Sequence, residues 1–170
     1  GHLFEGDKRS MTLFTTVEPF DKDTGEGTHL MRIEYRYDRT NKELEREEAL
    51  VETALPKFPP PGKELDRSRI KLKRKKKFTI ASGVEDFEIS YIWIPLQDTQ
   101  TLDQPPPPVE PIKMEQHKLC WWLPQGIEVK FSLKDPDKPE GKMEFSEIFP
   151  IRAPSAHLTK DQIQKLIDSL

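Results

Sequence analysis

The side chains that most often carry chemistry are few and scattered in this chain. His117 and Cys120 are three positions apart, so on a strand they lie on opposite faces and suit neither a metal site nor a Cys–His couple. Ser155 follows a proline, where helix capping explains a serine as well as nucleophilic attack does. The chain contains no glycine-rich phosphate loop and no Gly-x-Ser-x-Gly sequence. The sequence favours binding over catalysis, and it predicts no metal site and no cofactor.

The strongest charge signal is a basic run over residues 69–77. In an extended strand, one face of this run carries Arg69, Lys71, Lys73, Lys75 and Lys77. That row would either hold phosphates or RNA, or form a solvated face paired with the acidic residues 43–48. Arg74 and Lys76 lie on the other face, beside apolar side chains. If that face lines an interior, they need an anion, supplied by a ligand carboxylate or by Glu88, unless they lie exposed at its mouth.

Aromatic residues supply the apolar half of a candidate binding site. Trp93 shares a strand face with other large apolar residues, and the adjacent Trp121 and Trp122 must point to opposite faces. The candidate ligand-binding residues are Tyr35, Arg74, Lys76, Trp93 and Trp122. A second candidate surface, for protein contact, combines Trp121 with Pro106 and Pro107 of a tetraproline run. The proline run is equally explained as a stiff spacer.

Hydrophobic alternation predicts about eight strands, followed by one helix. The strands are expected over residues 11–17, 28–37, 43–55, 69–80, 86–94, 117–123, 127–133 and 142–151. Residues 43–55 contain strong helix formers, but they follow a short turn after a strand, so we predict a strand there. Gly83 favours a hairpin between the fourth and fifth of these strands. A C-terminal helix should start at Thr159, with Gln162 completing a capping box.

A chain of 170 residues has the length of one domain. We expect a loose, tag-derived lead over residues 1–10, a β-barrel over 11–154 and a helix over 155–170 that packs on the barrel. Eight strands in meander order with a C-terminal helix resemble the calycins, the barrels of lipocalins and fatty-acid-binding proteins, although the first strand lacks their Gly-x-Trp signature. A pleckstrin-homology-like sheet is the nearest alternative.

The calycin resemblance implies a carrier or chaperone for a hydrophobic small molecule, one that could bear a carboxylate. The alternative is an assembly module that binds another protein, and the net charge of -3 makes RNA binding the least favoured hypothesis. No apolar run is long enough to span a membrane. A single cysteine, Cys120, fits a reducing compartment, either the cytoplasm or an organelle stroma or matrix. Because the chain starts with Gly1, we expect that it was trimmed from a precursor, together with any targeting peptide.

Overall fold

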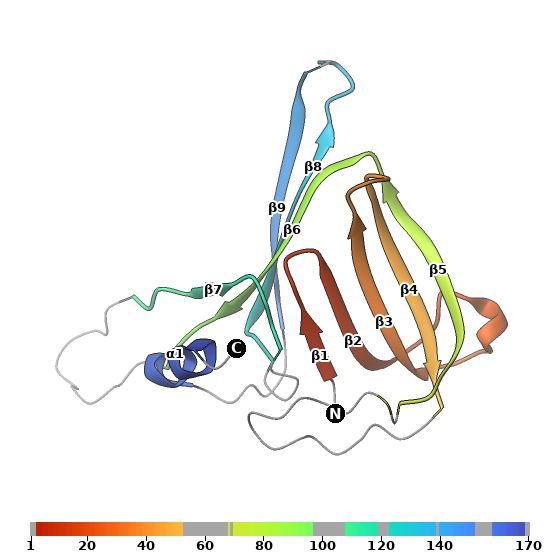
Figure 1. Cartoon of the computed structure of the whole chain (residues 1–170), viewed down its shortest axis with the longest axis horizontal. Helices are drawn as coiled ribbons and strands as arrows, with labels where there is room; N and C mark the ends of the chain where they lie inside the picture. The colour runs from red at the N-terminus through yellow and green to blue at the C-terminus, as the bar shows by residue number, and fades with distance from the viewer. Residues whose placement is uncertain are drawn as a thin grey trace.

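The protein folds into two antiparallel β-sheets and one helix, as the computed structural model shows (Figure 1). The structure describes residues 3–52, 68, 70–96, 108–118, 123–138, 140–151 and 158–168. The five-stranded sheet has the order β1-β2-β3-β4-β5, and the four-stranded sheet has the order β7-β6-β8-β9. The elements are β1 (Leu3–Gly6), β2 (Ser10–Val17), the short 3-10 helix η1 (Lys22–Thr24), β3 (His29–Asp38), β4 (Glu43–Val51), β5 (Leu72–Ser82), β6 (Val84–Trp93), β7 (Ile112–Met114), β8 (Gly126–Lys134), β9 (Lys142–Pro150) and α1 (Lys160–Asp168).

The predicted mainly β class is confirmed, and residues 43–51 form a strand as expected. The reason is the tight turn before β4. Asp38 accepts hydrogen bonds from the backbone N–H groups of Thr40 (2.8 Å) and Asn41 (3.1 Å), and Lys42 takes a positive φ of 55°. This Asx-type turn returns the chain alongside β3, so the geometry of the turn outweighs the helix propensity of the sequence that follows.

The predicted hairpin around Gly83 is wrong, although both of its strands exist. Gly83 does adopt a positive φ of 75°, but β5 pairs with β4, whereas β6 pairs with β7 and β8. The charges of β5 and the apolar side chains of β6 explain this outcome. The basic β5 lies opposite the acidic β4, while β6 buries Phe87, Ile89, Tyr91 and Trp93 on one face and takes an internal position in the second sheet. The described strands therefore form two sheets and no closed barrel.

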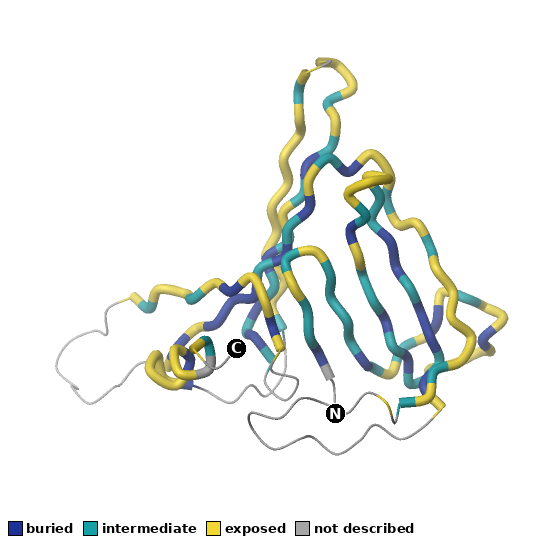
Figure 2. The backbone as a smooth tube through the Cα atoms, viewed as in Figure 1, coloured by how far each residue is buried: buried dark blue, intermediate teal, exposed yellow. Residues whose placement is uncertain are grey.

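The core lies where one face of β6 packs against the concave face of the five-stranded sheet. The β6 residues Phe87, Ile89, Tyr91 and Trp93 are buried in one cluster with Phe4, Tyr37, Leu158 and Ile163. Figure 2 shows that burial follows β6 along its length. This face of β6 therefore joins the two sheets and the α1 segment in one hydrophobic core.

The two ends of the chain add elements to this core. Thr159 and Gln162 form the predicted capping box, with hydrogen bonds of 2.9 Å to the Thr159 N–H and 3.3 Å to the Gln162 N–H. Residues Leu3–Gly6, expected to be loose, instead form β1 against β2. Gly6 is needed there, because a Cβ atom at this position would lie 1.9 Å from the Tyr91 hydroxyl oxygen. Neither β1 nor the three-residue β7 is long enough to show an alternating pattern in the sequence.

We predict that Trp93→Ala destabilises the protein by about 3–5 kcal/mol, because it leaves a large cavity in the shared core. Trp93 is only 1% exposed. The matched control is Ile94→Ala at the next residue, which is 48% exposed and should change stability by no more than about 0.5 kcal/mol. Guanidinium denaturation followed by circular dichroism measures both variants. Equal effects of the two substitutions would contradict this description of the core.

Candidate interaction surface on the β8–β9 arm

Two of the predicted ligand contacts, Arg74 and Lys76, lie exposed on β5 and contact the η1 segment. Arg74 donates a hydrogen bond of 2.7 Å to the carbonyl oxygen of Asp23. Lys76 forms ion pairs with the carboxylates of Asp21 (2.7 Å) and Asp23 (3.1 Å). The hydrogen bond from Lys76 holds the pKa of the Asp21 carboxyl below its ordinary value. Both cations thus bind the segment around η1 to β5, the edge strand of the sheet.

Tyr35 belongs to a second polar cluster, on the concave face of the same sheet. Its hydroxyl accepts a hydrogen bond of 2.8 Å from Arg46, and the Arg46 guanidinium lies 3.8 Å from the centre of the Phe20 ring. Arg46 also forms a buried ion pair with Glu48, which accepts a 3.0 Å hydrogen bond from the Phe20 N–H. The side chains of this pair are 8% and 1% exposed. The buried charges of Arg46 and Glu48 are thus paired with each other inside the protein.

The structure does not gather the predicted ligand-binding residues at one place. Trp93 lies in the core between the sheets, whereas Arg74 and Lys76 lie on the exposed β5. Trp122 and the predicted protein-contact residues Trp121, Pro106 and Pro107 lie outside the described residues. The small-molecule site therefore stays a prediction.

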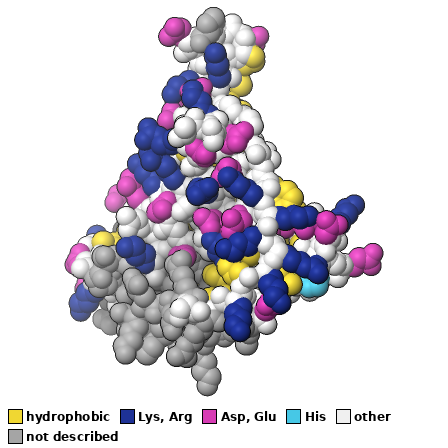
Figure 3. All heavy atoms as spheres, turned by 45° about the vertical axis from the view of Figure 1, so that its right-hand side comes forward, with side chains coloured by type: hydrophobic (Ala, Val, Ile, Leu, Met, Phe, Trp, Pro, Cys, Tyr) yellow, Lys and Arg dark blue, Asp and Glu magenta, His cyan; other side chains and the backbone are white. Residues whose placement is uncertain are grey.

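The basic run is paired with acidic side chains, the second of the two interpretations that the sequence allowed. Lys77 forms an ion pair with Glu45, and Lys73 forms one with Glu52. Figure 3 shows lysine and arginine side chains interspersed with aspartate and glutamate side chains over this side of the molecule. The register of β4 and β5 brings the two charge types opposite one another.

We predict that Glu48→Gln costs about 3–5 kcal/mol of stability, because it leaves the buried Arg46 guanidinium without its counter-charge. The double variant Glu48→Leu, Arg46→Met should recover part of this loss, since neither charge then remains buried. Lys8→Met is the control: it breaks an exposed pair with Glu88 and should cost less than about 1 kcal/mol. Urea unfolding of the four proteins, wild type included, measures the differences. A double variant that is no more stable than Glu48→Gln would contradict the pairing.

A second candidate surface for interaction lies on the hairpin formed by β8 and β9, which is called the β8–β9 arm. In Figure 1 the arm rises beyond the five-stranded sheet, with β9 at its outer side. All nine residues of β9 are exposed, which Figure 2 shows along the whole strand. The exposed large apolar side chains on β9 are Met143 (38%), Phe145 (43%), Ile148 (55%) and Phe149 (48%). A strand with this much exposed apolar surface is unusual in a protein that has no partner.

The apolar side chains of the arm form one face that continues from the core. Phe131 on β8 stacks on Phe145 of β9, with ring centres 4.9 Å apart and an angle of 14° between the planes. Phe131 in turn lies opposite Phe87 of β6, which is buried in the core. The apolar face therefore begins under the five-stranded sheet and ends in solvent at β9.

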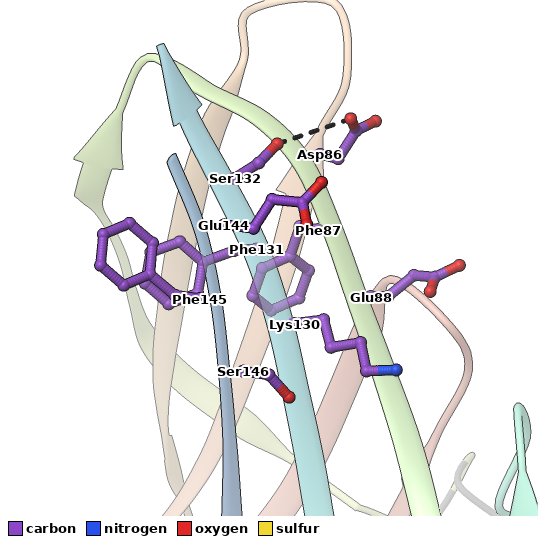
Figure 4. Close-up of a pocket in the computed structure, with 9 residues that line it drawn as sticks. All are labelled: Asp86, Phe87, Glu88, Lys130, Phe131, Ser132, Glu144, Phe145 and Ser146. Atoms are coloured by element: carbon purple, nitrogen blue, oxygen red, sulfur yellow. Dashed lines mark hydrogen bonds between the residues drawn. The ribbon is translucent and has the colours of Figure 1, made fainter. Parts of the chain in front are cut away.

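A hollow of about 350 Å³ lies on the same arm (Figure 4). It is lined by Asp86, Phe87, Glu88, Lys130, Phe131, Ser132, Glu144, Phe145 and Ser146. Ser132 is buried and donates a long hydrogen bond (3.5 Å) to Asp86, which also pairs with Lys142 at 2.8 Å. The lining contains no histidine to activate the serine, so its chemistry is that of a polar contact surface beside aromatic rings.

The outer edge of β9 also presents unpaired backbone groups. Ile151 N–H donates to Gln125 O, and Asp135 N–H donates to Gly141 O, each at 2.9 Å, so residues 141 and 151 face β8. In an antiparallel ladder the backbone groups of successive residues point to opposite sides. The ladder between β8 and β9 has no register shift, so Lys142, Glu144, Ser146 and Ile148 direct their N–H and C=O groups away from β8. No described strand pairs with this edge.

The other sheet edges are less suited to accept a strand. β1 and β7 have only four and three residues, and β5 carries a row of lysines, which is a common protection against strand addition. β9 combines nine residues, one largely apolar exposed face and a free edge. The sequence predicted β9 as a strand but did not mark it as a candidate surface. The available signal was the alternation of Met143, Phe145 and Phe149 on the last predicted strand, which has one neighbour in a meander.

No known protein family, curated protein or solved structure matches the chain. The described part of the chain holds no cluster of three or more His, Cys, Asp or Glu side chains that could ligate a metal ion. Its one α-helix, α1, is too short and too polar to cross a membrane.

The pairing of Asp86 with Lys142 predicts a pH effect on the arm. The hydrogen bond from Lys142 lowers the pKa of the Asp86 carboxyl, so the pair stabilises the fold above the unfolded-state value of about 3.9 and is lost as the pH falls through the folded-state value. We expect Lys142→Met to raise the pKa of Asp86 toward its ordinary value in a carboxyl carbon-13 NMR titration. Lys134→Met, which removes a lysine opposite residue 142, should leave most of the shift in place. An unchanged pKa in Lys142→Met would contradict the pairing.

Proposed function

We propose that the protein is a non-catalytic interaction module that binds a protein partner by adding a β-strand to the outer edge of β9. The single observation that carries this proposal is that all nine residues of β9, an edge strand, are exposed, and that one of its faces carries Met143, Phe145 and Phe149. Strand addition would satisfy the free backbone groups of Lys142, Glu144, Ser146 and Ile148. It would also remove the aromatic rings of Phe145 and Phe149 from water, which supplies affinity.

The surroundings of β9 support recognition of one kind of strand. Phe145 and Phe149 favour apolar residues on one face of the incoming strand, while Glu147 on that face and Glu144 on the other favour basic ones. The hollow beside Ser132 and Ser146 leaves room for a larger side chain on the polar face. Backbone bonds would give affinity, and these side chains would give selectivity.

The calycin-like barrel and the carriage of a small molecule that it implies stay predictions from the sequence. An enclosed apolar cavity would favour them. The hollow on the arm instead opens to solvent and is lined by charged side chains as well as aromatic rings, and the hollow beside Arg9 and Arg39 is open and lined largely by charged side chains. The described structure therefore favours the interaction module, which was the alternative hypothesis.

A display selection tests the proposed function. Extended peptides of random sequence are selected on the immobilised protein and counter-selected on the double variant Phe145→Lys, Phe149→Lys, which charges two exposed positions. We expect wild type to enrich peptides with alternating apolar residues and to bind them at least about tenfold more tightly than the variant, a difference of about 1.4 kcal/mol. Ile80→Lys is the matched control on the exposed edge strand β5, and it should bind like wild type.

Two results would contradict the proposal. Equal binding by wild type and the β9 variant would remove β9 from the interface, and loss of binding in Ile80→Lys would assign it to a different edge. Native mass spectrometry with lipid extracts tests the competing hypothesis, which is that the protein carries a small molecule. A small-molecule adduct that persists in the β9 variant, without any β9-dependent peptide binding, would favour the carrier hypothesis instead.

A further inference from the structure

We infer that the strand that β9 accepts is β9 of a second copy of this chain, in antiparallel orientation, with the two-fold axis at Ser146. This inference rests on the proposed function and names the partner. The two four-stranded sheets would then join into one eight-stranded sheet that runs through both copies. Closed two-fold pairing of this kind uses the same surface on both subunits, so one self-complementary edge is sufficient.

The backbone of β9 meets the first requirement, which is matching hydrogen-bonding positions. The outward-facing residues are Lys142, Glu144, Ser146 and Ile148, all at even positions. An axis at Ser146 pairs this residue with its own copy and pairs Glu144 with Ile148 of the second copy, so outward-facing groups always meet outward-facing groups. Pro150 lies opposite Lys142 of the second copy, at the end of the strand, where its missing N–H removes only a terminal bond.

The side chains meet the second requirement, which is the absence of like charges directly opposite one another. With the axis at Ser146, Met143 lies opposite Phe149 of the second copy, and Phe145 lies opposite Glu147. An axis one residue further on would place Glu147 opposite itself, which is destabilising. The axis at Ser146 also aligns all nine residues of β9, and it places the smallest side chain of the strand at the centre.

The position of the arm meets the third requirement, which is space for a second copy. β9 is the last strand of its sheet, and its arm extends beyond the five-stranded sheet (Figure 1). The apolar face that leads from Phe87 through Phe131 to Phe145 would continue into the arm of the second copy. A nine-residue strand is only about 30 Å long, so the interface falls at the small end of specific interfaces, and we expect a dimer that dissociates on dilution.

Sedimentation velocity over a concentration series tests the dimer. We expect wild type to shift from monomer to dimer as its concentration rises, and Ser146→Lys to weaken the association by about tenfold or more, because it places two like charges on the axis. Ser146 is exposed in the single chain, so this substitution should leave the fold intact. Ser82→Lys is the control, since Ser82 is an exposed serine on an edge strand of the other sheet. Wild type that stays monomeric at every concentration would overturn the inference.

A disulfide test fixes the register. In a Cys120→Ala background, Ser146→Cys should form a covalent dimer under mild oxidation, because residues at a hydrogen-bonded pair lie about 5.5 Å apart between Cα atoms, within the range that a disulfide spans. Ser82→Cys should stay monomeric. Cross-linking by Phe145→Cys and not by Ser146→Cys would move the axis and overturn the register proposed here.

The outcomes separate this inference from the proposed function. A protein that stays monomeric and yet binds selected peptides through β9 would overturn the dimer and leave the interaction module standing. A protein that neither dimerises nor binds any peptide through β9 would overturn both. A dimer that forms equally well in Ser146→Lys would place the contact elsewhere and overturn the inference.

Discussion

The structure depends on the burial of one face of β6. Tyr91 and Trp93 of this strand are 0% and 1% exposed, and they hold the concave face of the five-stranded sheet against the four-stranded sheet. Gly83 makes this possible, because its positive φ turns the chain directly from an edge strand of one sheet into a central strand of the other. Without that burial, the two sheets would be joined by the short linker at Gly83 and by a few polar contacts, such as the hydrogen bond from Ile89 N–H to the carbonyl oxygen of Lys8.

The position of β6 also determines what the rest of the second sheet can do. β6 has β7 on one side and β8 on the other, and β7 has only three residues, so the second sheet can extend mainly through β9. The core includes Val84 and Phe87, and Phe131 is partly buried against it, whereas Phe145 on β9 is 43% exposed. In the five-stranded sheet, by contrast, Lys76 and Arg74 bind the η1 segment, and Arg46 is paired within the protein. The arm therefore carries exposed apolar surface that no described part of the protein covers.

Local patterns in the sequence predicted most of the local structure, although the described ends of the strand expected over 117–123, residues 117–118 and 123, belong to no strand. Alternation predicted β2, β3, β8 and β9, and the capping box at Thr159 predicted the start of α1. The pairing of strands was harder, because Gly83 permits a hairpin and a change of sheet equally, and only the burial of β6 decides between them. The candidate site was hard to predict for the same reason, because it depends on which strands pair. Sequence alone shows that Phe145 and Phe149 are apolar, but their exposure depends on which strand lies at the edge.

The most direct test of the account is amide hydrogen exchange along β9, measured by NMR for the dilute protein and again with a β9-binding partner present. The free edge predicts slow exchange for Phe145 and Glu147, which face β8, and fast exchange for Ser146 and Ile148, which face outward. Binding should then protect Ser146 and Ile148. Slow exchange of these two amides in the dilute monomer, or no gain of protection when a partner is bound, would contradict the claim that β9 is an open edge that accepts a strand.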